Sequence, residues 1–174
     1  MSNRSPTQSV SHTHTGRIIY VVASRLVQGS ATNEQVILLA ETCTGPDGKK
    51  LQGNFAQATS AYIAKFPQKD GIQSFQTGDG PAAYRYTILK EQGITFLVFS
   101  ELQVKYRILV AFLNEFRTLF FRRIHSDVRF AVAYSLQNEF DSQDPTLDKM
   151  IMKYNDRRYD KVNEALEKTE QVRG

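Results

Sequence analysis

The stretch EQGITFLVFSE at residues 91–101, followed by VKYRILVAFLNEFRTLF at residues 104–120, decides the fold of this chain. Its first half is rich in β-branched and aromatic residues, which predicts a strand over residues 94–100. Its second half repeats apolar residues at helical spacing, which predicts a long helix over residues 104–123. The wide apolar stripe is typical of a helix that packs on a core rather than one that holds a cofactor. The stripe consists of Leu109, Phe112, Leu113, Phe116, Leu119 and Phe120.

Two further strands are predicted near the N-terminus, at residues 17–25 (RIIYVVASR) and 35–41 (QVILLAE). A Gly-Ser turn signal lies between them, so we expect an antiparallel hairpin. Both strands are apolar at nearly every position, which indicates that helices cover both of their faces.

A short helix and two more strands are predicted between this hairpin and the strand at residues 94–100. The helix covers residues 55–66, and Pro67 ends it. Strands at residues 72–77 and 83–90 follow, and links of hairpin length predict a three-stranded meander. Tyr84 and Tyr86 alternate along one strand, as in ordinary cross-strand packing. The expected apolar side of the short helix consists of Phe55, Ala58, Tyr62, Ile63 and Phe66.

A last helix is predicted from about Pro145, with Leu147, Ile151 and Tyr154 on one side. Residues 127–134 are ambiguous between strand and loop. The order of elements is therefore strand, strand, helix, three strands, helix, helix. This order predicts an α+β fold in which a five-stranded antiparallel sheet lies between one helix and two helices, an α-β-α sandwich.

The composition is that of a globular domain, with 174 residues, of which 41% are hydrophobic and 23% charged. No apolar run approaches the ~20 residues that span a bilayer. Cys43 is the single cysteine, which excludes an internal disulfide. Residues 1–16 are polar and rich in Ser and Thr, which predicts a disordered arm.

Common catalytic and cofactor-binding motifs do not occur in the sequence. Gly48, Lys49 and Lys50 lack the spacing of a phosphate-binding P-loop. His12 and His14 have no further ligands nearby, which argues against a metal site. HExxH, CxxC, GxSxG and GxGxxG are also absent. The sequence therefore predicts neither an enzyme nor a bound metal or cofactor.

Basic residues are concentrated between residues 102 and 130, a stretch that contains six Lys and Arg and two Asp and Glu. The difference of four equals the net charge of the whole chain, +4. The pattern favours a solvated helix face, although a basic helix end also attracts acidic membranes or nucleic acid. The interleaving of aromatic and basic residues typical of RNA-recognition modules is lacking, so nucleic acid is not an expected partner. The basic residues are Lys105, Arg107, Arg117, Arg122, Arg123 and Arg129, and the acidic ones are Glu115 and Asp127.

The stretch YDKVNEALEKTEQVRG at residues 159–174 resembles the opening turns of a coiled-coil helix. Val162, Ala165, Thr169 and Val172 recur at alternating steps of three and four, and charges of both signs lie between them. About two heptads are visible, fewer than a sustained coiled coil shows. A solvated terminal helix is the competing interpretation.

The order of these segments resembles one family, the longin-type R-SNAREs, which are long vesicle-associated membrane proteins of the synaptobrevin superfamily. IIYVVASR and VILLAE resemble the first two strands of that family. EQGITFLVFSE, AFLNEF at residues 111–116 and AYSLQNEF at residues 133–140 resemble later segments. DKVNEALEKTEQVRG resembles the start of a SNARE motif. The resemblance implies a disordered arm at 1–16, a longin domain at 17–156 and the start of a SNARE motif at 157–174.

The resemblance also implies a regulatory hydrophobic groove between the first helix and the third strand. Such a groove would bind the protein's own SNARE helix or a sorting partner. The competing interpretation, strongest for Ile63 and Phe66, is that these side chains belong to the protein's own core. The matching groove residues are Tyr62, Ile63, Phe66, Ile72 and Phe75.

As a SNARE motif, residues 157–174 would place Val162, Ala165, Thr169 and Val172 in the first layers of a four-helix bundle. Q-SNARE helices and sorting or regulatory proteins are then the expected partners. The signature arginine of the central layer and a membrane anchor would lie in a segment missing from this chain. The resemblance implies a location on the cytoplasmic face of endosomal, Golgi or secretory vesicles.

Three other functions remain open at this point. A longin-like subunit of a vesicle coat or tethering complex would fold residues 147–172 back onto the sheet as a packed helix. An enzyme built on a profilin-like sheet would need a group of polar catalytic residues, which the sequence does not show. A lipid-surface or nucleic-acid binder would use Arg117, Arg122, Arg123 and Arg129, with steep salt dependence.

Overall fold

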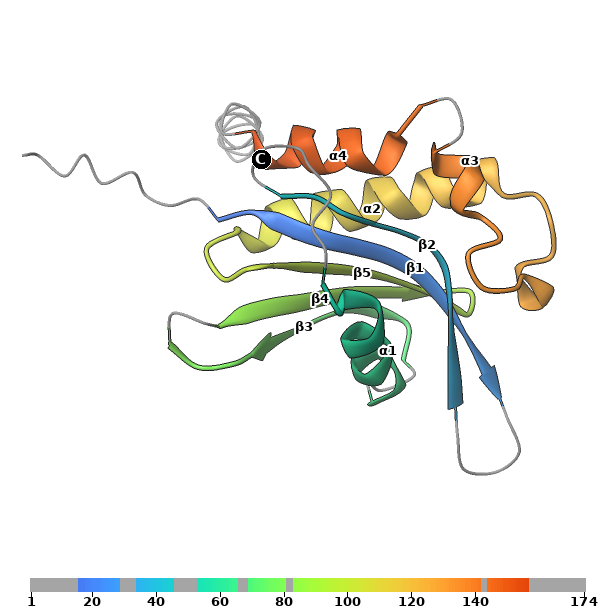
Figure 1. The fold of residues 1–174 in the computed structure, drawn as a ribbon, viewed down its shortest axis with the longest axis horizontal. Coiled ribbons are helices and arrows are strands. Elements are labelled where there is room, and N and C mark those ends of the chain that lie inside the picture. Colours follow the sequence, from blue (N-terminus) through green and yellow to red (C-terminus); the bar gives the residue numbers. More distant parts are fainter. Residues whose placement is uncertain are drawn as a thin grey trace, which may run out of the picture.

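A computed structural model describes residues 16–28, 34–45, 53–65, 69–80, 83–141 and 144–156. Five strands form one antiparallel sheet in the order β2-β1-β5-β4-β3 (Figure 1). The predicted hairpin and meander are both present, and β1 lies beside β5, which joins them. The strands are β1 Ile18–Gln28, β2 Glu34–Cys43, β3 Gly71–Thr77, β4 Tyr84–Glu91 and β5 Ile94–Glu101.

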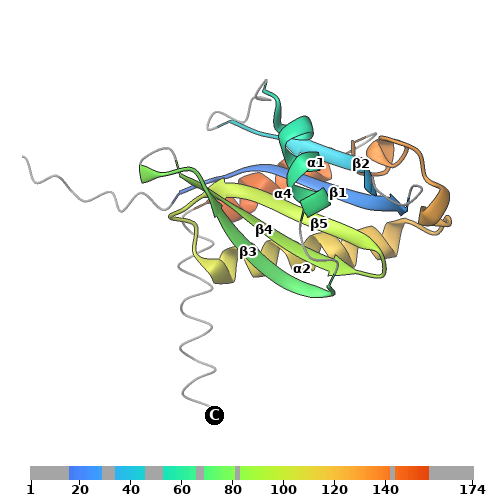
Figure 2. The same cartoon turned by 90° about the horizontal axis from the view of Figure 1, so that it is seen from below.

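The helices cover the two faces of the sheet unequally. Helix α1 lies alone on one face, and the longer α2 lies with α3 and α4 on the other (Figures 1 and 2). The predicted α+β sandwich is confirmed, with the short α3 as an additional element. The ambiguous segment at residues 127–134 is a loop that contains a 3₁₀ turn, η2. The helices are α1 Phe55–Lys65, α2 Tyr106–Arg123, α3 Gln137–Asp141 and α4 Thr146–Asn155, and η2 covers Val128–Phe130.

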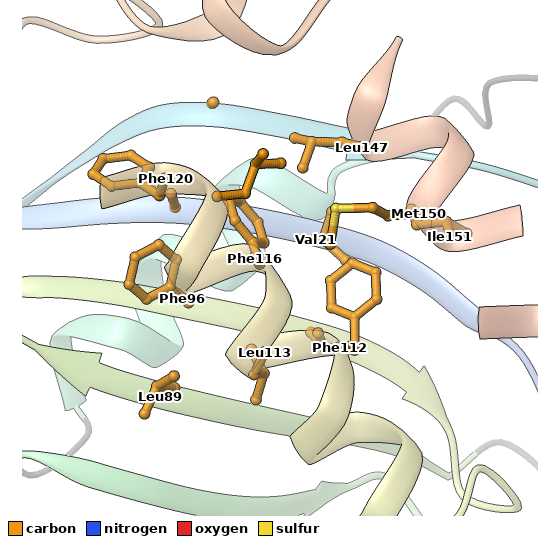
Figure 3. Packing of buried hydrophobic residues seen from close by; sticks show 14 of the residues in the cluster. Val21, Leu89, Phe96, Phe112, Leu113, Phe116, Phe120, Leu147, Met150 and Ile151 are labelled. Atoms are coloured by element: carbon orange, nitrogen blue, oxygen red, sulfur yellow. The ribbon is translucent and has the colours of Figure 1, made fainter. Parts of the chain in front are cut away.

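The larger hydrophobic cluster lies between the sheet and α2, α3 and α4. Phe96 of β5 is at its centre, with ring centroids 5.2 Å from Phe116 and 5.3 Å from Phe120 (Figure 3). The whole predicted stripe of α2 is buried here. Leu147, Met150, Ile151 and Tyr154 of α4 complete the cluster.

A second cluster lies between the sheet and α1 and is smaller. Ile63 is its one fully buried α1 hydrophobic residue, and the rest of its buried members come from the strands. One helix of 11 residues faces five strands on this side. Aromatic side chains at the margin of the cluster therefore stay partly exposed. The buried members are Ile19, Tyr20, Val22, Leu38, Ile63, Tyr86, Ile88, Leu97 and Phe99.

The outer edge of β2 is sealed by the chain that leads into α3. The Tyr134 amide donates to the Leu38 carbonyl at 2.8 Å. The Gln137 side chain binds both backbone groups of Glu41: its Oε1 accepts from the amide and its Nε2 donates to the carbonyl, each at 2.8 Å. Unpaired strand edges invite pairing with other chains, so these bonds protect β2. The strand β3 forms the opposite edge of the sheet.

Helix α4 is fastened at its C-terminal end. The Asn155 side chain accepts from the Ile18 amide at 2.8 Å and donates to the Ile18 carbonyl at 3.0 Å. The Tyr154 hydroxyl donates to Glu115 of α2. The start of β1 and the end of α4 are thereby held together. The predicted N-terminal arm, apart from Gly16, and the segment at residues 157–174 lie outside the described residues.

Candidate partner-binding surface

Four half-buried aromatic side chains pack against the second cluster around α1: three lie toward the β3 edge, and Phe55 stacks on Tyr20 of β1, on the β2 side. Phe55 and Tyr62 come from α1, Phe75 from β3 and Tyr84 from β4, and all four pack against the second cluster. We name this set the aromatic strip. Its members pack against the second cluster, on the face of the sheet that α1 alone covers; Figure 2 shows the position of α1 on that face.

The aromatic strip rests on the buried rings of Tyr86 and Phe99. Tyr62 and Tyr86 have ring centroids 4.6 Å apart, and Tyr84 and Phe99 stack at 5.0 Å. Phe55 lies 5.8 Å from Phe99. Ring pairs at these separations add to the energy of apolar burial, so the floor of the strip is a rigid aromatic layer.

Two of the predicted groove residues, Tyr62 and Phe75, belong to the aromatic strip. The Tyr62 hydroxyl is 2.8 Å from Thr77 Oγ1, so α1 and β3 are bonded across the strip. Phe75 lies opposite Tyr86 in the β3–β4 register. Both side chains keep accessible surface while packing against the core, which is what a partner-binding residue requires.

Ile63 is fully buried in the second cluster, as the competing interpretation of the sequence expected. The assignment of Ile72 to the groove is wrong, because Ile72 packs against the larger cluster on the opposite face of the sheet. Side chains alternate along a strand, so Ile72 and Phe75, three positions apart, must point to opposite faces. Phe66 lies outside the described residues.

The apolar side of α1 also differs from the predicted one. Ala58 is exposed, whereas Thr59 is fully buried. Phe55, Thr59, Tyr62 and Ile63 are spaced at i, i+4, i+7 and i+8, which is one helix face. Threonine is polar and alanine is apolar, so the sequence pattern indicated Ala58 rather than Thr59 on this side.

Tyr84 and Phe55 are the strip residues that sequence reasoning did not assign to the groove; Phe55 was placed only on the apolar side of its helix. For Tyr84 the signal was present, because Tyr84 and Tyr86 alternate and therefore share a face of the sheet. Pairing with Phe99 explains why both rings lie on the α1 face.

Burial raises the pKa of two tyrosines of the second cluster, Tyr86 and Tyr20. Desolvation by burial raises the pKa of Tyr86. Burial, and then the hydrogen bond to the Glu41 carboxylate, raise the pKa of Tyr20 far above its ordinary value. A phenol is protonated at neutral pH even at its ordinary pKa of about 10, so the floor formed by Tyr86 and Phe99 carries no charge there.

Two pockets are present, one at the Phe55 end of the strip and one away from it. One of about 210 Å³ adjoins Phe55 and is lined by Tyr20, Glu41 and Cys43 among others. The other, of about 390 Å³, lies at the end of the sheet between Arg25, Ile94 and Phe121. Across the described ranges, His, Cys, Asp and Glu nowhere gather in threes as metal ligands do. Within the same ranges, no helix has the length and apolarity needed to cross a membrane.

Comparison with known proteins identifies the family. The Longin family, described as a regulated-SNARE-like domain, matches residues 39–143, and no curated protein matches the chain. The match runs from the middle of β2 to the chain beyond α3, and β1 completes the same sheet. Longin domains regulate vesicle trafficking and interact with SNARE and trafficking proteins. The chain therefore belongs to the longin family of regulated-SNARE-like domains.

Proposed function

We propose that this chain is the regulatory longin domain of a vesicle R-SNARE, with the longin domain at residues 17–156 and the SNARE motif beginning at residues 157–174. The domain binds its own SNARE helix, or sorting and regulatory proteins, through the aromatic strip. It acts in vesicle trafficking and membrane fusion, on the cytoplasmic face of endosomal, Golgi or secretory vesicles.

The aromatic strip is the observation that carries this proposal. An amphipathic helix binds by laying its apolar face on a preformed apolar surface. Tyr62 and Phe75 offer such a surface on a rigid floor. Within the chain, a matching apolar face is supplied by Val162, Ala165, Thr169 and Val172.

Competition for that face provides the regulation. The same four residues would form the first layers of a bundle with Q-SNARE helices. One helix face cannot be buried twice, so binding to the strip in cis opposes assembly with Q-SNAREs. A sorting protein that occupies the strip releases the helix.

A subunit of a vesicle coat or tethering complex is the second candidate. It requires a C-terminal helix packed on the sheet, and α4 does bury Leu147, Met150, Ile151 and Tyr154. The two candidates differ in the role of residues 157–174. Only the R-SNARE requires these residues to pair with helices of other proteins. Binding of the chain to Q-SNARE helices favours the first candidate.

A charge placed in the strip tests the proposal. Phe75→Glu puts a carboxylate on the strip, whereas Gln76→Glu puts one at the next, exposed position of β3 and serves as the matched control. A labelled peptide of residues 157–174 is titrated onto the chain ending at Asp156. We expect Gln76→Glu to bind as the unchanged protein does, and Phe75→Glu and Tyr62→Glu to lose binding while circular dichroism shows a folded protein.

Two results would contradict this function. Equal peptide binding by Phe75→Glu and Gln76→Glu would place the helix elsewhere. Unfolding of both Tyr62→Glu and Phe75→Glu would assign these rings to the core, leaving no strip for a partner.

A further inference from the structure

A projecting loop at one end of the molecule displays large apolar side chains to solvent. Phe130 is 76% exposed, Val132 is 67% exposed and Tyr134 is 44% exposed. The other exposed large hydrophobic residues in the described part of the chain are Tyr106 and Met152. The loop carries η2 and lies beyond the C-terminal end of α2 (Figure 1, orange).

The loop is held in place by hydrogen bonds, so its exposure is part of the folded structure. Arg25 of β1 donates from Nε and Nη2 to the Ala131 carbonyl, at 2.8 and 2.6 Å. Asp127 caps η2 by accepting from the Arg129 amide at 3.1 Å and pairs with its guanidinium at 2.7 Å. Fixed apolar groups that remain in water are a mark of an interaction site.

Tyr134 helps to attach the loop to β2. Phe130 and Val132 are therefore the apolar side chains of the loop that are available to a partner. The Tyr134 amide bonds to β2, and its backbone adopts the left-handed region with φ 57°. Burial, and then the Glu41 carboxylate, raise the pKa of Tyr134.

The loop is surrounded by positive charge. Residues 122–134 contain three arginines and one carboxylate, and Arg25 adds a fourth arginine. The guanidinium groups of Arg25 and Arg123 bond to neutral oxygens, so these bonds leave their charges uncompensated. Four positive charges less Asp127 give +3, and counting Glu139 and Glu41, whose carboxylate acts on Tyr134, leaves +1.

We propose that this loop docks on an anionic bilayer, with Phe130 and Val132 in the interfacial region and the arginines on acidic headgroups. A stable protein interface buries about 1,000 Å² or more, which two side chains do not supply. Shallow membrane attachment requires only a few apolar groups together with basic residues. The site is separate from the aromatic strip and is independent of the function proposed for it.

The absence of tryptophan from the sequence allows a direct test. Phe130→Trp introduces a single indole at the loop tip, and Met152→Trp introduces one on α4, where Met152 is 59% exposed. Each protein, as the full chain, is mixed with vesicles of phosphatidylcholine alone or with added phosphatidylserine. We expect a blue shift, and quenching by brominated acyl chains, for F130W with the anionic vesicles and for M152W with neither.

Binding strength is measured by vesicle sedimentation. We expect the double change Phe130→Ser and Val132→Ser to weaken binding about tenfold or more through lost apolar contact. Arg122→Gln, at an exposed position, and higher salt should each weaken it further. No blue shift of F130W with anionic vesicles, or an equal shift of M152W, would overturn the proposal. Equal binding to neutral vesicles would overturn the role of the arginines.

Discussion

Replacement of Gln137 by alanine tests how the β2 edge is protected. In the structure, Gln137 binds the amide and the carbonyl of Glu41 at 2.8 Å each and also donates to Asp141 at 2.6 Å. Alanine removes all three bonds and leaves two backbone groups of β2 without their partner. Gln137 belongs to neither hydrophobic cluster, so the effect of the change reports mainly the hydrogen bonds.

The expected loss of stability follows from these contacts. A hydrogen bond contributes about 0.5–1.5 kcal/mol net, and water can reach the half-buried edge, so we expect ~1–2 kcal/mol in total. For a domain of this size, that loss lowers the melting temperature by roughly 3–8 °C. A local loss of ~1.4 kcal/mol makes amide exchange roughly tenfold faster.

Urea unfolding and hydrogen exchange measure these quantities. We expect the Glu41 amide to exchange faster in Gln137→Ala than in Asn138→Ala, a control at the exposed neighbouring position of α3. Unchanged protection of the Glu41 amide in Gln137→Ala would refute the reasoning, because another group would then be sealing the edge.

Three further outcomes are expected. Ile63→Ala should cost ~2–5 kcal/mol in urea unfolding, because a fully buried side chain leaves a cavity. Tyr62→Phe should cost about 1 kcal/mol by losing the bond to Thr77, while peptide binding to the strip is retained. The free energy of unfolding should fall as pH rises above about 10, because the pKa of Tyr20 is raised in the folded protein and the unfolded chain therefore loses the phenol proton at lower pH. Tyr20→Phe should reduce this loss of stability at alkaline pH, as measured by urea unfolding at a series of pH values.

The fold could be predicted from sequence because its elements have strong local signals. Residues 94–100 are rich in β-branched and aromatic residues, and the stripe of α2 repeats with the period of a helix; both segments are buried. The hairpin and meander follow from short links between strands. The pairing of β1 with β5 joins segments far apart in the chain, so no local pattern specifies it.

The candidate site was harder to predict because its residues meet only in three dimensions. Tyr62 and Phe75 were assigned to it, whereas Ile72 was misplaced although the alternation of β3 contradicts a shared face with Phe75. Gln137 was missed because its partner, Glu41, is 96 positions away and belongs to another element. The two-residue period of a strand and the 3.6-residue period of a helix reveal which side chains lie on the same face of that element. They do not reveal which other element this face contacts.

Amide hydrogen exchange on the full chain, compared with the chain ending at Asp156, tests the central claim most directly. If residues 157–174 lie on the aromatic strip, their presence should slow exchange in Phe55–Lys65 and Gly71–Thr77 and leave α2 unchanged. Equal exchange of these two segments in both proteins would contradict binding of the SNARE helix to the strip.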